Sequence, residues 1–392
     1  MAIVAAFAVP HPPLIIPAVG RGQERGIQAT IDAYEEVGRR VAACAPDTLV
    51  ISSPHSIMYR DYLHISPGSA ASGDFGQFGA PEACHHVRYD EAFVSSLGAA
   101  AAADDLAAGT EGEQDPALDH ATMVPLHFIE EAYREAGRDM DFRVVRIGLS
   151  GLSPTAHYRL GTLIQRVADV LGRRVTYVAS GDLSHKLTKD GPYGFAPEGP
   201  EFDRIVCDAF LSGDFLPLLT MSPRLAERAA ECGLRSFQMM AGALDQTEIH
   251  PELLSYEGPF GVGYAVAAFT PCGPERSCPK RDYLNVYEKA RAHEQSERRA
   301  SEDPYVRLAR LSLETHVRDG GRVRLPDDLP KDLTLPDELA TTRAGCFVSL
   351  KKDGELRGCI GTFQPTQKDV AEEILYNAVS AALHDPRFSP LK

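Results

Sequence analysis

Val175-Thr-Tyr-Val-Ala-Ser-Gly-Asp-Leu-Ser-His185 joins a short apolar run to a polar turn that carries an aspartate and a histidine. The run is rich in β-branched residues without polar alternation, which is typical of a strand buried on both faces. A helical pattern over Pro154–Leu171 precedes it. The same order recurs twice, where helical patterns near residues 26–44 and 123–136 lead into the apolar runs Thr48–Ser52 and Phe142–Leu149. This alternation predicts an α/β domain with a mixed or parallel sheet covered by helices.

Two domains and a linker are expected along the 392 residues, because one core rarely serves so long a chain. The first domain, 1–271, opens with an apolar strand over Ile3–Val9 and closes with a strand over Phe260–Phe269. Residues 272–302 are rich first in proline and then in charge, and we expect a linker there. The second domain, 303–392, has a smaller α+β pattern: a helix over Val306–Val317, a hairpin around Asp353-Gly354 and a helix over Asp369–His384.

The composition disfavours several classes of protein. A net charge of -15 argues against nucleic acid as a partner, and no stretch reaches the roughly 18–20 apolar residues that span a membrane. The apolar start, residues 1–9, lacks the basic region and cleavage site of a signal peptide. The 8 cysteines form no CxxC pair, so we expect reduced thiols and a cytoplasmic location. The sequence is compatible with a homo-oligomer.

Histidines and an aspartate follow three of the predicted strands directly. His11 follows the first strand, His55 follows Thr48–Ser52, and Asp182 and His185 follow Val175–Ala179. Ligands of open α/β sheets bind beyond the carboxyl ends of the strands, and prolines beside His11 and His55 stiffen their loops. A single such histidine is more often an ordinary loop residue, but several together favour a site. Since neutral imidazole is the commonest metal ligand, the pattern predicts a divalent metal on His11 and His55.

A third ligand is expected where the segment Ala229-Ala-Glu-Cys-Gly233 separates two helical patterns. Glu231 could project its carboxylate into a cleft there, and two histidines with one carboxylate form the ligand set of non-haem Fe(II) oxygenases. Cys232 is the alternative ligand, as a thiolate. Both residues could instead be structural, with Glu231 in solvent and Cys232 in the core. We favour Fe(II) and Glu231, with Cys232 next and Zn or Cu as the alternative ions.

Asp182 and His185 are the candidates for acid–base chemistry. His185 would act as the base, with Asp182 orienting its ring. Ser180 or Asp182 could instead cap a short helix, and both roles can hold at once. His120, which follows Asp119 and leads into a helix, is a further candidate. The glycine- and serine-rich segment 66–79 predicts an exposed loop. We therefore interpret the three histidines in or near that loop as surface residues: His64, His85 and His86. The aromatic residues of loops near the site are candidate substrate contacts: Phe75, Phe78, Tyr193 and Phe195.

Residues 1–270 resemble the class III extradiol ring-cleavage dioxygenases, the LigB-like family to which the Memo proteins are related. The resemblance is carried by PHPP at His11, SPH at His55, LDHATMVPL around His120, SGDLSH ending at His185 and ECGLRSFQMMAGALD from Glu231. It implies Fe(II) on His11 and His55, with His185 as catalytic base and His120 as a second active-site histidine. Ring-cleaving members place a glutamate near the third ligand position, whereas Memo-like members place a cysteine followed by glycine. This sequence has both, and we favour Glu231 over Cys232.

Residues from about 304 to 392 resemble the AMMECR family, on GCFVSLKKDGELRGCIGT (Gly345–Thr362) and HDPRF (His384–Phe388). Because the family normally continues beyond this point, we expect the second domain to be incomplete. The order of the two domains resembles the fused family named AmmeMemoRadiSam system protein A, which is encoded beside a radical-SAM protein. The resemblance therefore implies a radical-SAM protein as a candidate partner.

Two functions from different classes follow. The first is a non-haem Fe(II)-dependent extradiol-type dioxygenase that acts on a catechol-like aromatic substrate with O2. The second is a Memo-like metal-binding module that acts with a radical-SAM partner and cleaves no ring. A Zn hydrolase on the same ligands is a third expectation. Uptake of O2 separates the first from the others.

Overall fold

The computed structural model describes residues 2–273, 276–352 and 355–391, and it divides into two compact units, Met1–Glu288 and Lys289–Lys392. The division falls inside helix α10 (Tyr283–Ala300), within the segment expected to be a linker. Asp353-Gly354, the expected hairpin turn, lies outside the described residues.

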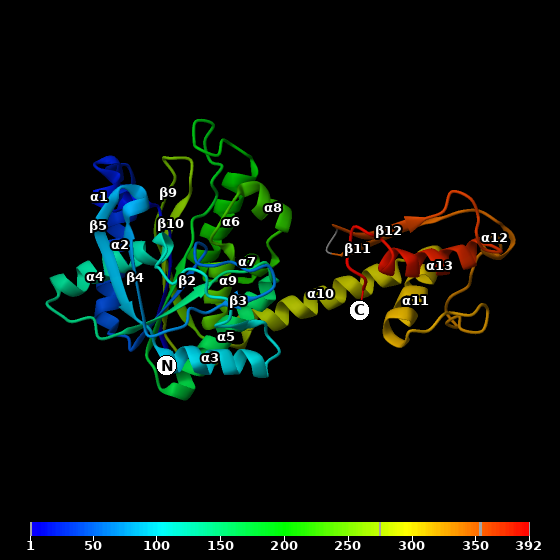
Figure 1. Ribbon diagram of the computed structural model, residues 1–392, viewed down its shortest axis with the longest axis horizontal. Coiled ribbons are helices and arrows are strands. Elements are labelled where there is room, and N and C mark those ends of the chain that lie inside the picture. Colours follow the sequence, from blue (N-terminus) through cyan, green and yellow to red (C-terminus); the bar gives the residue numbers. More distant parts are fainter. Residues whose placement is uncertain (1, 274–275, 353–354, 392) are drawn as a thin grey trace. The chain divides into compact units, whose positions relative to one another are not determined.

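A six-stranded mixed sheet forms the centre of the first unit, in the order β7-β2-β8-β1-β10-β9. Figure 1 labels three of its strands, β2, β9 and β10. The first four strands of that order are mutually parallel, and β10 runs antiparallel to both of its neighbours. The expected α/β class is confirmed. The strand predicted over Phe260–Phe269 begins later, and β9 was not predicted. The strands are β1 (Ile3–Val9), β2 (Thr48–Ser53), β7 (Arg143–Gly148), β8 (Val175–Ser180), β9 (Ile249–Glu257) and β10 (Tyr264–Pro271).

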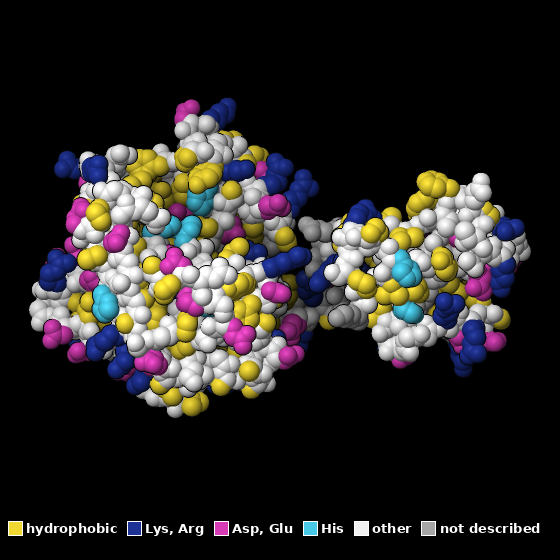
Figure 2. All heavy atoms as spheres, viewed as in Figure 1, with side chains coloured by type: hydrophobic (Ala, Val, Ile, Leu, Met, Phe, Trp, Pro, Cys, Tyr) yellow, Lys and Arg dark blue, Asp and Glu magenta, His cyan; other side chains and the backbone are white. Residues whose placement is uncertain are grey.

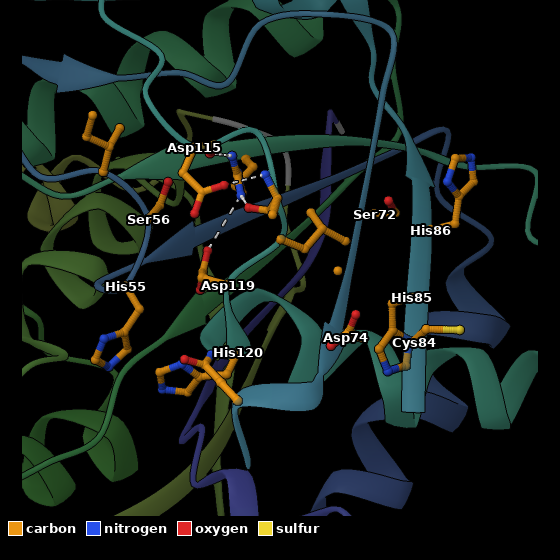
Figure 3. A pocket seen from close by; sticks show the side chains of 16 residues that line it. His55, Ser56, Ser72, Asp74, Cys84, His85, His86, Asp115, Asp119 and His120 are labelled. Atoms are coloured by element: carbon orange, nitrogen blue, oxygen red, sulfur yellow. Dashed lines mark hydrogen bonds and ion pairs between the residues drawn. The ribbon is translucent and has the colours of Figure 1, made fainter. Parts of the chain in front are cut away.

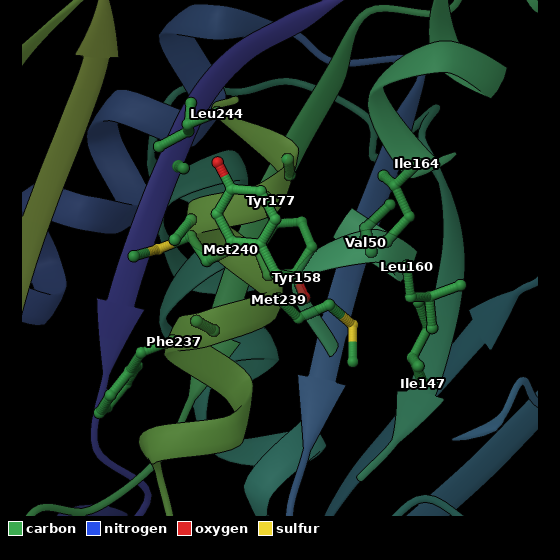
Figure 4. Close-up of a cluster of buried hydrophobic side chains, with 14 of the residues drawn as sticks. Val50, Ile147, Tyr158, Leu160, Ile164, Tyr177, Phe237, Met239, Met240 and Leu244 are labelled. Atoms are coloured by element: carbon green, nitrogen blue, oxygen red, sulfur yellow. The ribbon is translucent and has the colours of Figure 1, made fainter. Parts of the chain in front are cut away.

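Helices cover both faces of this sheet. Alternate residues of each central strand point to opposite sides, so each strand contributes to the packing on both faces. In β8, Tyr177 packs into a core with α5 and α9, while Val178 packs into a second core with α2 and α4. Figure 4 shows Tyr177 among residues of the first of these cores, including Tyr158 and Met240. The first unit's helices are α1 (Pro17–Gly20), α2 (Gln28–Cys44), α3 (Glu91–Ala103), α4 (His120–Glu135), α5 (Pro154–Leu171), α6 (Glu198–Ser212), α7 (Leu216–Thr220), α8 (Pro223–Ala229) and α9 (Leu234–Ala243), with short 3-10 turns at Pro13–Ile15, Gln23–Ile27, Gly76–Phe78 and Pro279–Arg281.

The segment 66–79 is not the exposed loop that its composition predicted. It contains strand β4 (Ala70–Phe75), which pairs with β5 (Ala80–Arg88). Gly76 and Gly79 lie in the turn between the strands, where Gly79 adopts a positive φ of 80°. His85 and His64 are consequently buried, so their interpretation as surface residues was wrong, whereas His86 is exposed. His64 lies in the short strand β3 (Leu63–His64), which pairs with β6 (Ala108–Gly109).

The second unit is a small α+β structure with its own core. Buried Leu308, Leu339 and Ile374 come from three different helices and lie in this core. Its elements are α11 (Pro304–Asp319), α12 (Asp337–Thr341), β11 (Phe347–Lys352), β12 (Glu355–Gly361) and α13 (Val370–Leu383), with β11 and β12 paired antiparallel. Across the described residues of both units, no helix is long and apolar enough to cross a membrane.

Candidate metal centre

His11 is fixed from several sides immediately after β1. Its backbone N–H donates to Oδ1 of Asp182 at 2.7 Å, and Tyr34 of α2 donates a hydrogen bond to the carbonyl of Pro10. The ring is 2% exposed, and its Nδ1 lies 3.1 Å from the Ser180 hydroxyl oxygen. This contact leaves Nε2 as the nitrogen available for a metal. Burial, followed by the neighbouring histidines, lowers the pKa of His11 well below its usual value, so the ring is neutral as a ligand must be.

His55 meets His11 from the end of β2. Its backbone N–H donates to the Ser53 hydroxyl oxygen at 3.2 Å, and that hydroxyl donates to Oδ1 of Asp119 at 2.5 Å. Asp119 also accepts from the backbone N–H of Thr122 at 3.0 Å and thereby caps helix α4. The two imidazoles approach edge-on, with 3.1 Å between their Nε2 atoms. The loop that carries His55 is thus anchored to the start of a helix.

Cys232 reaches the same point from the turn between α8 and α9. Ala230 adopts a positive φ of 53° there, and the backbone N–H of Gly233 donates to the carbonyl of Asp182 at 3.1 Å. The turn lies directly against Gly181, where an added Cβ would stand 2.2 Å from the Cα of Gly233. This backbone contact places the Cys232 sulfur 3.6 Å from Nε2 of His11.

Glu231 points elsewhere. Its Oε2 accepts from the backbone N–H of Leu234 at 2.6 Å, at the start of α9. Among the described residues, the metal-ligating groups near His11 contain Cys232 and not Glu231. The structure therefore brings the second-ranked candidate, rather than the first, to the two histidines.

The geometry of His11, His55 and Cys232 fits a metal ion. One ligand atom of each lies within 4.8 Å of the others. Bond lengths of about 2.05 Å to nitrogen and 2.3 Å to sulfur in a tetrahedral site separate two nitrogens by about 3.3 Å and nitrogen from sulfur by about 3.6 Å. The observed separations are 3.1 Å and 3.6 Å. His11 is thus spaced from both His55 and Cys232 as ligands of one ion would be.

Asp182 and His185 lie beside this group. Nδ1 of His185 is 2.6 Å from the carbonyl oxygen of Ala230, and Nε2 is 3.8 Å from Oδ2 of Asp182. Burial raises the pKa of Asp182 to about 7, against the hydrogen bond from His11, and burial lowers the pKa of His185. Residues 181–186 form no helix, so the interpretation of Ser180 or Asp182 as a helix cap was wrong.

His120 begins α4, and its ring centroid is 4.2 Å from that of His55. Burial and then His55 lower the pKa of His120 to about 4, so it is neutral near pH 7. Two of the candidate aromatic residues also lie nearby: the Phe78 ring is 5.3 Å from His120, and the Tyr193 ring is 5.2 Å from His185. Phe75 instead belongs to the buried core.

A cavity of about 890 Å³ opens beside His55 and His120 and extends to β5 (Figure 3). Histidine side chains are also visible at a hollow on the surface of this unit (Figure 2).

The sequence reasoning missed Arg146, which lines the cavity although its side chain is only 1% exposed. Its guanidinium donates to the Ser66 hydroxyl at 2.7 Å and to the carbonyl of Ala117 at 2.5 Å, which fixes the loop before His120. The available signal was an arginine in the middle of the apolar run Phe142–Leu149, between Val145 and Ile147.

Two family models match successive parts of the chain. The family described as "Catalytic LigB subunit of aromatic ring-opening dioxygenase" matches residues 5–267, and the family AMMECR1 matches residues 306–392. A protein of Clostridium acetobutylicum is 34% identical over 99% of this chain and 81% of its own length. A Thermotoga maritima protein is 50% identical over a segment that covers 23% of this chain and 49% of that relative. The crystal structure of an uncharacterized Escherichia coli protein covers 68% of this chain and 99% of its own, at 15% identity and a TM-score of 0.41.

Proposed function

Because the chain belongs to the LigB family, with an AMMECR1 match after the LigB region, we propose that its first unit is a metal-dependent module of the Memo-like kind. The ligands in this proposal are His11, His55 and Cys232. The observation that supports it is the convergence of two Nε2 atoms and one sulfur at ligand spacing. A thiolate in place of the carboxylate favours this function over ring cleavage.

The surrounding residues have separate tasks in this proposal. The bound ion supplies a Lewis acid and, for iron or copper, a redox centre. Nε2 of His185 accepts a proton from the bound substrate, because Nδ1 is already engaged by the carbonyl of Ala230. Neutral His120, whose ring lies beside that of His55, offers a hydrogen bond to the substrate. The partner we propose is a radical-SAM protein.

A cobalt experiment tests the ligand set. Protein loaded anaerobically with Co(II) should show a thiolate-to-metal charge-transfer band in the near ultraviolet. The Cys232→Ser variant should lose this band, and His55→Ala should bind Co(II) at least tenfold more weakly. Glu231→Gln is the matched control, since glutamine still accepts from Leu234. Loss of the spectrum in Glu231→Gln and its retention in Cys232→Ser would reverse the assignment.

The second candidate function is extradiol cleavage of a catechol-type ring by the Fe(II) form with O2. The rings of Phe78 and Tyr193 favour it, because they flank His120 and His185 and could hold an aromatic substrate. We propose to record O2 consumption and new visible absorbance across a panel of catechols. Uptake that needs both Fe(II) and a catechol, and that falls at least a hundredfold in His185→Asn, would establish ring cleavage. Metal binding without uptake for any catechol would leave the Memo-like module.

A further inference from the structure

A second set of ligand atoms adjoins the first and shares Cys232 with it. One ligand atom each of Asp182, His185 and Cys232 lies within 4.8 Å of the other two. We propose that these side chains hold a second divalent cation, so that the Cys232 thiolate bridges two ions. The first ion is the one on His11 and His55. This inference rests on the proposed function, because it requires Cys232 to be a ligand of the first ion.

The hydrogen bonds of His185 prepare it for this role. Its Nδ1 lies 2.6 Å from the carbonyl oxygen of Ala230, which only accepts, so Nδ1 carries the proton. Nε2 then presents a lone pair toward Oδ2 of Asp182, 3.8 Å away. A backbone carbonyl on the other ring nitrogen is the usual arrangement for a histidine that binds a metal. His185 is therefore oriented as a ligand as well as a base.

Asp182 supplies the negative charge. It is 6% exposed, and its Oδ1 accepts from the backbone N–H of His11. Within the described part of the chain, its contacts with basic side chains are to His11 at 3.9 Å and His185 at 3.8 Å, and neither is lysine or arginine. A buried carboxylate without a permanent cation is costly, and a metal ion would compensate for this cost. Imidazole, carboxylate and thiolate together are ligands of Zn(II) and similar borderline ions.

The form with one bound ion and the form with two differ in the role of His185. His185 cannot accept a proton through Nε2 while Nε2 binds a metal. The form with one ion keeps His185 as a base, and the form with two ions converts it into a ligand. Occupancy of the second site would therefore switch off any chemistry that depends on His185, ring cleavage included.

The experiment is a metal titration of the full chain with reduced thiols, using Zn(II) and Co(II) and counting bound ions by native mass spectrometry. The intact protein should bind two ions. Asp182→Asn and His185→Asn should each bind one, since both asparagines retain the structural hydrogen bonds to His11 and Ala230. His250→Ala, which removes a 68% exposed histidine, should still bind two. In the two-cobalt form, magnetic coupling through the shared sulfur should weaken the Co(II) electron paramagnetic resonance signal relative to the variants.

The outcomes distinguish this inference from the proposed function. One ion in the intact protein, lost in His55→Ala but kept in Asp182→Asn, overturns the second site and leaves the first. Two ions in both asparagine variants would place the second ion elsewhere and also overturn it. No bound ion in the intact protein would reject both proposals.

Discussion

Buried carboxylates anchor the segment that leads into His185. Asp182 accepts from the backbone of His11, and Asp203 accepts from the backbone N–H of Ser184 at 2.7 Å and from the Tyr256 hydroxyl at 2.8 Å. Asp203 is 1% exposed, and burial raises its pKa to about 7 despite these two donors. The folded protein thus retains a proton on Asp203 that the unfolded chain releases near pH 4.

The contribution of Asp203 to stability should consequently decline as the pH rises from about 4 to 7, because in this window Asp203 is more protonated in the folded state than in the unfolded state. The Asp203→Asn variant should lose this pH dependence, which amounts to at most roughly 4 kcal/mol in the free energy of unfolding. Asparagine still accepts from Ser184 but cannot ionise. Chemical unfolding at pH 5, 6, 7 and 8 measures the effect. Asp208→Asn, at an exposed position of the same helix, is the control. Equal pH dependence in all three proteins would contradict the prediction.

At the scale of elements, the centre depends on contact between the loop after β8 and the turn before α9. The Cβ of an alanine at Gly181 would stand 2.2 Å from the Cα of Gly233, so Gly181→Ala must separate the two segments. Cys232 would then move away from His11, and we expect Zn(II) affinity to fall at least tenfold, or about 1.4 kcal/mol. Competition with a chromophoric chelator measures this affinity. Gly98→Ala in α3, where an added Cβ meets nothing within 4 Å, should bind Zn(II) as the intact protein does. Unchanged affinity in Gly181→Ala would show that the contact does not position the sulfur.

The elements differ in how well the sequence predicted them. The strands β1, β2, β7 and β8 were predicted to within about two residues, because buried parallel strands are continuously apolar. The edge strand β9 was not predicted, since most of its residues are only half-buried. The β4–β5 hairpin was also missed, because its glycines dominated the composition of a segment whose Phe75 is buried.

At the scale of the whole molecule, the two units have separate cores, and the candidate ligands all belong to the first. A bound metal stabilises only the structure that binds it, by about 2.7 kcal/mol at a free concentration one hundred times the dissociation constant. Calorimetry of the full chain should therefore show one transition that moves up in temperature with Zn(II) and another that does not. Cys232→Ser should lose the shift without altering the second transition. An equal shift of both transitions would indicate that the units unfold together.

The sequence by itself determined that His11, His55, Asp182 and His185 follow the carboxyl ends of strands, because apolar runs identify strands and strands of this sheet end at one edge. It did not determine the third candidate ligand. Glu231 and Cys232 are adjacent and both chemically suitable. Their directions depend on the left-handed backbone of Ala230 and on the contact between Gly181 and Gly233, which are 52 positions apart in the chain. That contact is long-range, so only the tertiary structure turned the sulfur toward the histidines and the carboxylate toward the helix.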